Sequence, residues 1–305
     1  MSFEVLGDVR HLCTTCGGCC EETLRLSEDE ARRIEGFGVA LGVDRSVVEG
    51  CTRREGGQCV FLDEESLCKI HKRFGLKAKP SVCQQYPLTA VSTEHGLRVG
   101  VDPGCYFAFD SWQTGPEASS DKLLARKVTL SDELFALEQK ILDLCAEDGQ
   151  TVAGVIRTLT GCPKGKAVPV DFASRVCSRL ASTDLAERLV HKDTAPLVRR
   201  YLAPVAELLP TLNAESPPRF VLSAADDAWA VETIRRMVFL RLVPALPVPQ
   251  AVALLAAAGA MLCAWAAPEE FGPTFCGWSR IMRYPEVLRQ IYPDADSFNW
   301  LAQGE

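Results

Sequence analysis

The spacing of hydrophobic positions along the chain changes near residue 120. Before this point short apolar runs are separated by glycines and turns, whereas beyond it apolar residues recur every three or four positions, as on one face of a helix. The first such helix follows the N-cap candidate Ser131, and its apolar face consists of Leu134, Leu137, Ile141, Leu142 and Cys145. Further helices are predicted at 150–160, 168–181, 184–210, 224–243 and 250–267. The second half is therefore predicted to be all-helical.

Shorter elements are predicted before residue 115. A helix is expected to begin at Ser27, because Glu30 three residues later completes a capping box. Two short strands, GGQCVFLD and LCKIHKRF, are predicted on either side of an acidic turn at residues 63–66. Each of these strands carries one cysteine, Cys59 or Cys68.

A second group of short elements follows Pro80. A helical turn there is expected to hold Cys83 and Tyr86. Residues 88–91 and 97–101 alternate in polarity on either side of a turn, which predicts a hairpin that leads to Cys105.

Together these elements predict an α+β fold that is mostly α. We expect a small cysteine-rich metal module with short β-hairpins over residues 1–115, called the cysteine module below. This module is expected to pack on an all-helical domain over residues 116–305.

One apolar segment must be weighed as a membrane span. No charged residue lies between Arg241 and Glu269. The three prolines at the start of this segment leave only about 17 uninterrupted apolar residues, at the short limit for crossing a bilayer. A buried core helix is therefore the preferred interpretation, with a membrane span as the alternative.

Composition and charge narrow the functional classes. The 305 residues are 47% hydrophobic and 24% charged, as in ordinary globular proteins. A net charge of −7 argues against a general nucleic-acid binder and gives no reason to expect attraction to an anionic membrane. The N-terminal sequence has no basic region followed by a long apolar stretch, so a cytoplasmic location with reduced thiols is expected.

The fourteen cysteines are unevenly distributed. Nine of them lie at positions 13, 16, 19, 20, 51, 59, 68, 83 and 105. The remaining five, Cys145, Cys162, Cys177, Cys263 and Cys276, are scattered and are expected to be buried packing residues. A dense group of thiols in a reducing compartment favours metal binding or redox chemistry over structural disulfides.

Four of the cysteines lie in the run CTTCGGCC, at positions 13, 16, 19 and 20. Two CxxC steps closed by an adjacent pair suit chelation by thiolates, since neighbouring cysteines do not easily bridge each other. Gly17 and Gly18 give the backbone freedom to wrap an ion and to turn amide groups toward sulfur. Because the side chains of adjacent residues diverge, Cys19 and Cys20 suit two separate centres, or one ligand beside a supporting thiol.

Several neighbouring residues have both an ordinary and a functional interpretation. The stretch 69–79 contains five lysines and arginines and no acidic residue, which suits a solvated basic face, charge compensation for thiolates, or a docking patch. His11, His71 and Tyr86 are weaker candidates for contacts with a metal or substrate. The acidic pair at positions 21 and 22 is expected to be solvated.

The order of these motifs resembles the YkgJ-type cysteine-cluster family, also described as the CxxCxxCC zinc- or iron-chelating domain. The resemblance covers roughly residues 10–112 and includes CVFLD, LCKIH, KPSVCQQYP and DPGC. It implies a metal site formed by Cys13, Cys16, Cys19, Cys20, Cys59, Cys68, Cys83 and Cys105. Eight thiolates could supply two zinc sites, or one iron–sulfur cluster and a second metal, and Cys51 is a ninth candidate. Iron or an iron–sulfur cluster is preferred, with zinc as the alternative.

The longer layout, with GLKAKPSVCQQYP, a hairpin, a cysteine and a helical second half, is similar to the flagellin lysine methylase branch. That resemblance implies an AdoMet-dependent protein lysine methylase, with AdoMet as a further cofactor and a protein as a substrate. The sequence thus predicts a metal-binding protein, with this enzyme as one alternative. A metal carrier or interaction module without catalysis is the other.

Overall fold

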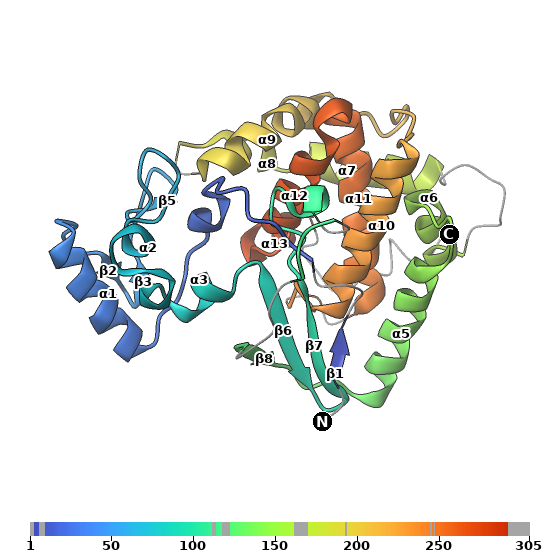
Figure 1. The fold of residues 1–305 in the computed structure, drawn as a ribbon. Helices are drawn as coiled ribbons and strands as arrows, with labels where there is room; N and C mark the ends of the chain where they lie inside the picture. Colours follow the sequence, from blue (N-terminus) through green and yellow to red (C-terminus); the bar gives the residue numbers. More distant parts are fainter. Residues whose placement is uncertain are drawn as a thin grey trace.

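The structure is a computed structural model that describes residues 3–5, 10–111, 114–117, 123–161, 170–192, 194–244, 246 and 248–291. Its described part is mostly helical with small sheets, so the predicted α+β, mostly α class is confirmed. Figure 1 shows the cysteine-bearing elements on one side, a narrow sheet in the middle and the long helices on the other side.

The cysteine-bearing side is built from short elements around a small core of its own. The core residues are Leu26, Ile34, Phe61, Ile70 and Ala78. Its elements are η1 (Gly18–Glu21), α1 (Glu28–Ala40), β2 (Val47–Val48), β3 (Cys51–Thr52), β4 (Arg54–Glu55), β5 (Gln58–Cys59), α2 (Lys69–Phe74), η2 (Leu76–Ala78) and α3 (Ser81–Gln85). β2 pairs with β3, and β4 pairs with β5, both antiparallel. Such a small core buries little apolar surface, so further stabilisation by metal ligation is physically reasonable.

Most of the short predicted elements are confirmed. α1 begins after Ser27, whose hydroxyl accepts a hydrogen bond from the Glu30 N–H in a complete capping box. α3 carries Cys83 after Pro80, as expected.

The predicted strand LCKIHKRF is wrong, because residues 69–74 form the helix α2. Only Leu62 and Cys68 form a single antiparallel bridge across the acidic turn. Ile70 is the buried residue of α2. A short helix with one side chain in the core needs no alternation of buried and exposed residues, so the apolar pattern alone does not distinguish it from a strand.

A four-stranded sheet lies between the cysteine-bearing side and the long helices, with the order β1-β7-β6-β8. β6 (Leu88–Thr93) and β7 (Gly96–Val101) form the predicted antiparallel hairpin. The outer strands β1 (Phe3–Val5) and β8 (Ala125–Lys127) were not predicted, and both pair parallel to the hairpin. Three residues are too few to show a period of two, and only pairing with the hairpin defines these strands.

Apart from the short strand β8, which departs from the all-helical prediction, the described part of the second half is helical. After the short helix α4 (Ala108–Ser111), which precedes the boundary, the helices of the second half are α5 (Asp132–Ala146), α6 (Val152–Leu159), α7 (Val170–Ala181), α8 (Leu185–Val190), α9 (Pro196–Leu208), η3 (Leu209–Thr211), α10 (Ala224–Phe239), α11 (Pro249–Ala266), η4 (Pro268–Glu270), α12 (Phe271–Ile281) and α13 (Pro285–Ile291). Cys162 and the start of the predicted helix 168–181 lie outside the described residues.

The single helix predicted at 184–210 is wrong, because the chain forms α8 and α9 instead. Pro196 lacks an N–H and holds the preceding Ala195 in a non-helical conformation, so one helix cannot run through this position. α12 and α13 were not predicted. All eleven residues of α12 except Pro273 are buried, so the segment has no polar face to reveal a helical period.

The large hydrophobic core lies among α5 to α13 and receives Tyr106 from the cysteine-bearing segment. α11 is at its centre, with every residue from Ala251 to Ala264 buried. Among the described residues α11 is long and apolar enough to cross a membrane, but 78% of its 18-residue window is buried inside the fold. A buried core helix gives the same length and hydropathy, and the preferred interpretation of this segment is confirmed.

The structure also connects the two predicted domains. β8, beyond residue 115, pairs with β6 from the cysteine module. Arg98 in β7 donates a hydrogen bond of 2.7 Å to Glu138 in α5, and both side chains are fully buried. The boundary near residue 115 stays a prediction, and a shared sheet and a buried ion pair cross it.

Candidate metal centre

The eight predicted cysteine ligands lie around two adjoining cavities. The larger cavity, about 320 Å³, is lined by Cys19, Cys20, Cys59, Cys68 and Cys83. The smaller cavity, about 140 Å³, is lined by Cys13, Cys16, Cys19, Cys20, Cys68, Cys83 and Cys105. The fold therefore brings together thiols that are up to 92 positions apart in the sequence, from residue 13 to residue 105.

Cys51 is separate from this group. It lies in β3, where it pairs with Val48 and bridges to Arg25, and it lines neither cavity. The ninth candidate is therefore a cysteine of the same module that does not share its site.

The loop of residues 13–20 is shaped by hydrogen bonds to sulfur. The Thr15 N–H donates to Cys13 Sγ at 3.5 Å, and the Gly18 N–H donates to Cys16 Sγ at 3.4 Å. Gly17 has φ of +75°, a left-handed conformation that favours glycine. The roles expected for the two glycines, backbone freedom and amide donation to sulfur, are confirmed.

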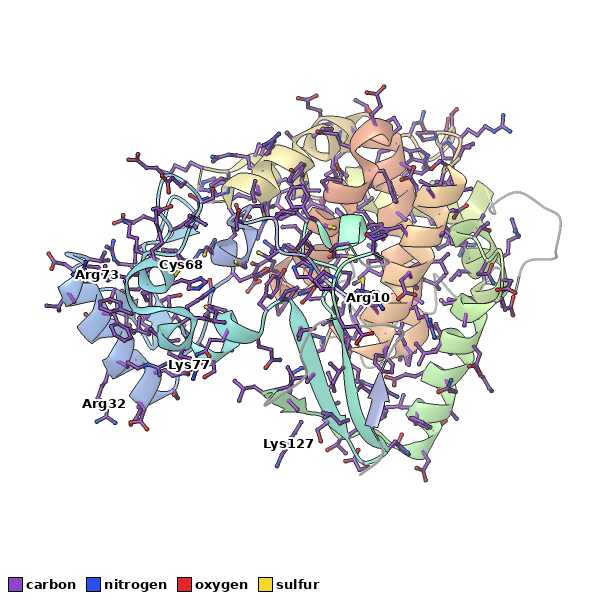
Figure 2. All side chains as sticks on the ribbon, viewed as in Figure 1. Arg10, Arg32, Cys68, Arg73, Lys77 and Lys127 are labelled. Carbon is purple, nitrogen blue, oxygen red and sulfur yellow. The ribbon has the colours of Figure 1, made fainter. Side chains whose placement is uncertain are left out.

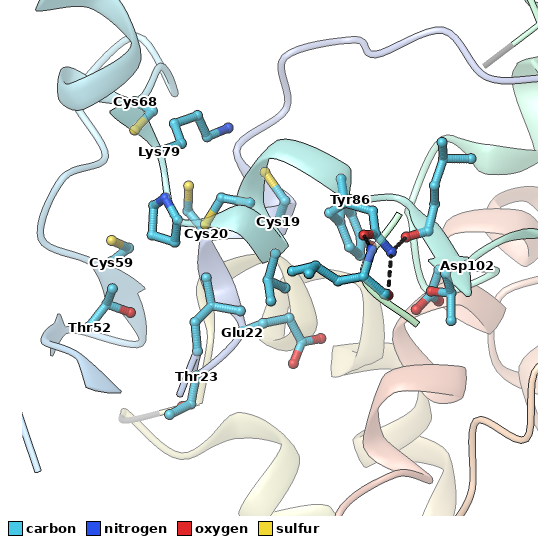
Figure 3. A pocket seen from close by; sticks show the side chains of 18 of the residues that line it. Cys19, Cys20, Glu22, Thr23, Thr52, Cys59, Cys68, Lys79, Tyr86 and Asp102 are labelled. Carbon is cyan, nitrogen blue, oxygen red and sulfur yellow. Dashed lines mark hydrogen bonds between the residues drawn. The ribbon is translucent and has the colours of Figure 1, made fainter. Parts of the chain in front are cut away.

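The other four cysteines come from separate short elements. Cys59 ends β5, and Cys68 is the N-cap residue of α2. Cys83 lies in α3, and Cys105 follows β7 in a turn closed by its own N–H, which donates to the Asp102 carbonyl at 3.1 Å. Figure 3 shows Cys19, Cys20, Cys59 and Cys68 around the larger cavity.

The two adjacent cysteines of the loop are electrostatically unequal. A hydrogen bond from the Cys20 thiol lowers the pKa of Cys19 to about 6, and the positive charges of Lys79 and Arg280 act in the same direction against burial. The same hydrogen bond, together with burial, raises the pKa of Cys20. Cys19 therefore holds the thiolate of this pair at neutral pH.

Neighbouring thiols raise one another's pKa values. Burial, followed by the charges of Cys59, Cys19 and Cys68, raises the pKa of Cys83 to about 12, although Lys79 opposes this. Burial, with a smaller contribution from Cys16, raises the pKa of Cys105 to about 12. Several thiols held this close together carry negative charge only when a cation compensates it, and a metal ion provides such a cation.

The basic stretch 69–79 divides into two kinds of residue. Lys79 lines both cavities, and Figure 3 shows its side chain between Cys68 and Cys19. Lys72 forms ion pairs with Asp63 and Glu65 at 2.7 and 2.8 Å. Lys69 is half-buried, while Arg73 and Lys77, labelled in Figure 2, are exposed, and none of the three lines either cavity.

Charge compensation therefore applies to Lys79, while most of the stretch is a solvated face.

The acidic pair at positions 21 and 22 was expected to be solvated, and for Glu21 this is wrong. Glu21 is 2% exposed, and its carboxylate accepts a hydrogen bond of 2.6 Å from the Leu197 N–H in the first turn of α9. It also accepts one of 3.4 Å from the Tyr106 hydroxyl. Burial raises the pKa of Glu21, and the Leu197 N–H opposes this. Neither contact could be read from local sequence, because the partners lie 176 and 85 positions away.

Two arginines from the end of the chain were also missed by sequence reasoning. Arg280 in α12 is 2% exposed and lines the smaller cavity. Arg283 forms a paired ion contact with Asp102, one arm of which is 2.8 Å long. Burial alone would raise the pKa of Asp102, but the Arg283 guanidinium outweighs it and holds the pKa below its usual range.

The weaker candidates have ordinary partners. His71 is exposed on α2, and His11 Nδ1 lies 3.5 Å from the Ser111 hydroxyl, where burial lowers the pKa of the histidine. The Tyr86 hydroxyl accepts a hydrogen bond of 3.1 Å from Arg280 Nη2. Both histidines line the smaller cavity, but the eight thiols already supply enough ligands for two four-coordinate sites.

Metal binding can be tested against this donor set. Among the described residues, no three His, Cys, Asp or Glu side chains already converge on one point as a metal site. The donors are nevertheless thiols, free of disulfides within the described part, and they surround two cavities with Lys79 and Arg280 beside them. This chemistry fits zinc, iron or an iron–sulfur cluster, and convergence requires rotation of the cysteine side chains.

Comparison with known proteins agrees with the site. Residues 12–105 match the CxxCxxCC family model, described as "Putative zinc- or iron-chelating domain". The resemblance predicted from the cysteine spacing is thereby confirmed. The matched segment begins one residue before Cys13 and ends at Cys105, so it contains all eight cysteines of the two cavities. The match supports metal binding by this part of the chain.

Two curated relatives are similar to part of the chain. Both are named "Lysine-N-methylase", one from Salmonella typhimurium and one from Salmonella choleraesuis, and each is 28% identical over 90 residues. The matches cover 29% of this chain and 22% of each relative. The chain thus matches about a fifth of the relatives' length. No solved structure matches the chain.

Proposed function

We propose that this protein chelates iron or zinc through eight cysteines arranged as two adjoining thiolate sites. The observation that carries the proposal is the gathering of all eight thiols around two cavities that share a wall. Cys20, Cys59, Cys68 and Cys83 would serve the larger cavity, while Cys13, Cys16 and Cys105 would serve the smaller one. Cys19, Cys20, Cys68 and Cys83 line both cavities, so the two sites would share a wall of thiols, and Cys19 carries the thiolate of the adjacent pair.

Iron, as an iron–sulfur cluster, is the preferred metal of this proposal, and zinc is the alternative. Both metals take cysteine thiolates, so the donor set supports either. When bound, the metal neutralises thiolates and, if it is an iron–sulfur cluster, supplies electron transfer. The chain's own residues hold the thiols, exclude water from the buried side and supply positive charge through Lys79. The proposal assigns the protein to a reducing cytoplasm, where such thiols remain available.

The deciding experiment is metal and acid-labile sulfide analysis, with a visible spectrum, on protein purified without oxygen. Iron with sulfide and a brown chromophore would establish an iron–sulfur protein. Zinc without colour would favour a structural thiolate site. Protein that retains no metal would contradict the proposal.

A matched pair of cysteine variants localises the site. Cys59→Ser removes a thiol that lines the larger cavity and should lower the metal content. Cys51→Ser removes a half-buried thiol of the same module that lines neither cavity, and should leave the metal content unchanged. Equal metal loss in both variants would show that the loss follows from unfolding rather than from ligation.

A second candidate function is an AdoMet-dependent lysine methylase, which the names of the two relatives suggest. The favouring observation is that the larger cavity also contains the Glu22 carboxylate and the Tyr86 ring on the side away from Cys59. A carboxylate could pair with a cationic sulfonium or lysine ammonium there. In such a reaction the neutral amine attacks the methyl carbon, the carbon–sulfur bond breaks, and a proton leaves the amine.

Calorimetric titration of the metal-loaded protein with AdoMet tests this candidate, together with mass spectrometry of a lysine-containing peptide. Binding that Glu22→Gln weakens, and a mass increase of one methyl group, would support it. Absence of AdoMet binding by protein that retains its metal would contradict the methylase while leaving chelation intact.

A further inference from the structure

Arg280 connects the helical half of the molecule to three separate cysteine-bearing segments. Its Nη1 donates to the Gly18 carbonyl at 2.8 Å, between Cys16 and Cys19 in the loop. Its Nε donates to the Gly104 carbonyl at 2.7 Å, one residue before Cys105. Three different nitrogens thus reach three partners, since Nη2 donates to the Tyr86 hydroxyl.

The third contact also leads to a cysteine-bearing element. Tyr86 is the C-terminal capping residue of α3, the helix that contains Cys83. The Arg280 guanidinium also lies 4.6 Å from the centre of the Tyr106 ring, next to Cys105 in sequence. Planar stacking and several fixed donors are properties of arginine that lysine does not share.

Cys276 within α12 and Arg283 just after its end also contact the Cys105 turn. The Cys276 thiol donates to the Cys105 carbonyl at 3.3 Å, one helical turn before Arg280. Arg283 pairs with Asp102 in the same turn. One face of the C-terminal region therefore contacts residues 102–105 at successive positions.

The charges around Arg280 would be unbalanced without it. Its guanidinium lies 3.6 Å from a Glu21 carboxylate oxygen and 3.5 Å from one of Glu22. If Arg280 were absent, the two acids, which directly follow Cys19 and Cys20 in the chain, would lose the guanidinium that lies beside both of them. Additional negative charge would disfavour thiolates there and so weaken metal binding.

We propose that Arg280 is a positioning residue of the metal centre, which holds the segments of Cys16–Cys19, Cys83 and Cys105 in the arrangement that ligation requires. This inference rests on the proposed function. Arg280 lies outside the matched segment 12–105, so the inference assigns a role in metal binding to the C-terminal part of the chain.

Titration of the metal-free protein with Co²⁺ tests this inference whichever metal is native, because the visible bands of cobalt report tetrahedral thiolate coordination. Arg280→Gln should weaken Co²⁺ affinity about 10- to 100-fold, the range typical when a partner that orients metal ligands is removed. The cobalt bands of the variant should also shift, since the ligand arrangement changes. Arg280→Lys keeps the charge but has one nitrogen, so it should restore only part of the affinity.

Arg98→Gln is the matched control. Arg98 is 1% exposed and ion-paired to Glu138, so it is as buried as Arg280, but it lines neither cavity. This variant should lower stability and leave Co²⁺ affinity and the cobalt bands unchanged. Wild-type affinity in Arg280→Gln, or an equal loss in Arg98→Gln, would overturn the inference.

If Arg280→Gln does not fold, the Co²⁺ affinities of Arg280→Lys and Arg98→Lys are compared instead. Weaker Co²⁺ binding in Arg280→Lys alone supports the inference, and equal affinities overturn it. Wild-type protein without thiolate–cobalt bands would contradict the proposed function, and the inference with it. Wild-type binding that the Arg280 variants leave unchanged would contradict the inference alone.

Discussion

At the scale of single residues, the adjacent cysteines show how position changes chemistry. Cys19 and Cys20 have the same side chain, yet the hydrogen bond between them lowers the pKa of one and raises the pKa of the other. Lys79 and Arg280 lie on the side of Cys19, which reinforces the difference. A pair of this kind contains one nucleophilic thiolate and one protonated thiol when no metal is present.

Cys19 is therefore expected to be the most readily alkylated cysteine of the loop in metal-free protein. Because only the thiolate reacts, the rate for Cys19 should rise as pH increases through about 6, the pKa to which it is lowered. Cys105, with a pKa raised to about 12, should remain unmodified at neutral pH. Iodoacetamide labelling with peptide mass spectrometry at several pH values measures both rates.

Metal loading serves as the control for this measurement. A metal-bound thiolate is shielded from the reagent, so loaded protein should show slow labelling of Cys19. Equal labelling of Cys19 and Cys105 in metal-free protein at pH 7 would contradict the assignment of the thiolate.

At the scale of elements, α12 determines how the helical half meets the cysteine-bearing side. It packs closely against α11, where Gly259 faces the Trp278 indole. A methyl group at Gly259 would lie 2.0 Å from Trp278 Nε1, a distance that requires the buried indole, and α12 with it, to shift. Since Arg280 lies two residues after Trp278, such a movement would also displace its contacts with the cysteine loop.

Gly259→Ala should therefore lower the free energy of unfolding by about 1–3 kcal/mol, as overpacking typically does. It should also reduce metal retention, through displacement of Arg280. Urea denaturation and metal analysis measure the two effects.

Gly36→Ala is the matched helical control. Gly36 lies inside α1, and a methyl group there meets nothing within 4 Å. This substitution should stabilise the protein by about 0.5–1 kcal/mol, because alanine loses less backbone entropy in a helix. Destabilisation by both substitutions would show that close packing at α11–α12 is not the cause.

At the scale of the whole molecule, the two predicted domains share more than a covalent link. The sheet combines β6 and β7 with β8, and Arg98, Asp102 and Glu21 form buried contacts with the helical half. Separating a buried ion pair strongly destabilises a protein, because one charge is left buried without its partner. Unfolding of one side should therefore destabilise the other.

Removal of the metal is predicted to lower the thermal stability of the helical half. All five tryptophans follow residue 105, so their fluorescence reports unfolding beyond the cysteine cluster. A chelator should lower the midpoint of this transition by about 5 °C or more, because a metal at saturating concentration contributes about 2.7 kcal/mol or more to folding. An unchanged tryptophan transition in metal-free protein would show that the two sides unfold independently.

Parts of the fold were predictable because their causes lie close together in the sequence. The capping box of α1, the hairpin and the helix after Ser131 depend on residues within a few positions of one another. α2 was wrongly predicted as a strand, because one buried isoleucine in a short segment is compatible with a helix or a strand, and only the surrounding core selects the helix. α12 was missed because it is buried on all sides and has no polar stripe.

The sequence by itself determined the mostly helical second half and a set of eight thiols of the type and spacing that suit chelation, since spacing and residue type carry that information. Only the tertiary structure decided that these thiols surround two cavities, that Cys51 stands apart, and that the buried Glu21 and Arg280 and the half-buried Arg283 lie beside them. Arg280 meets Gly18 across 262 positions of the chain. Contacts of that range depend on how helices and sheet pack together, which the local pattern of residues does not encode.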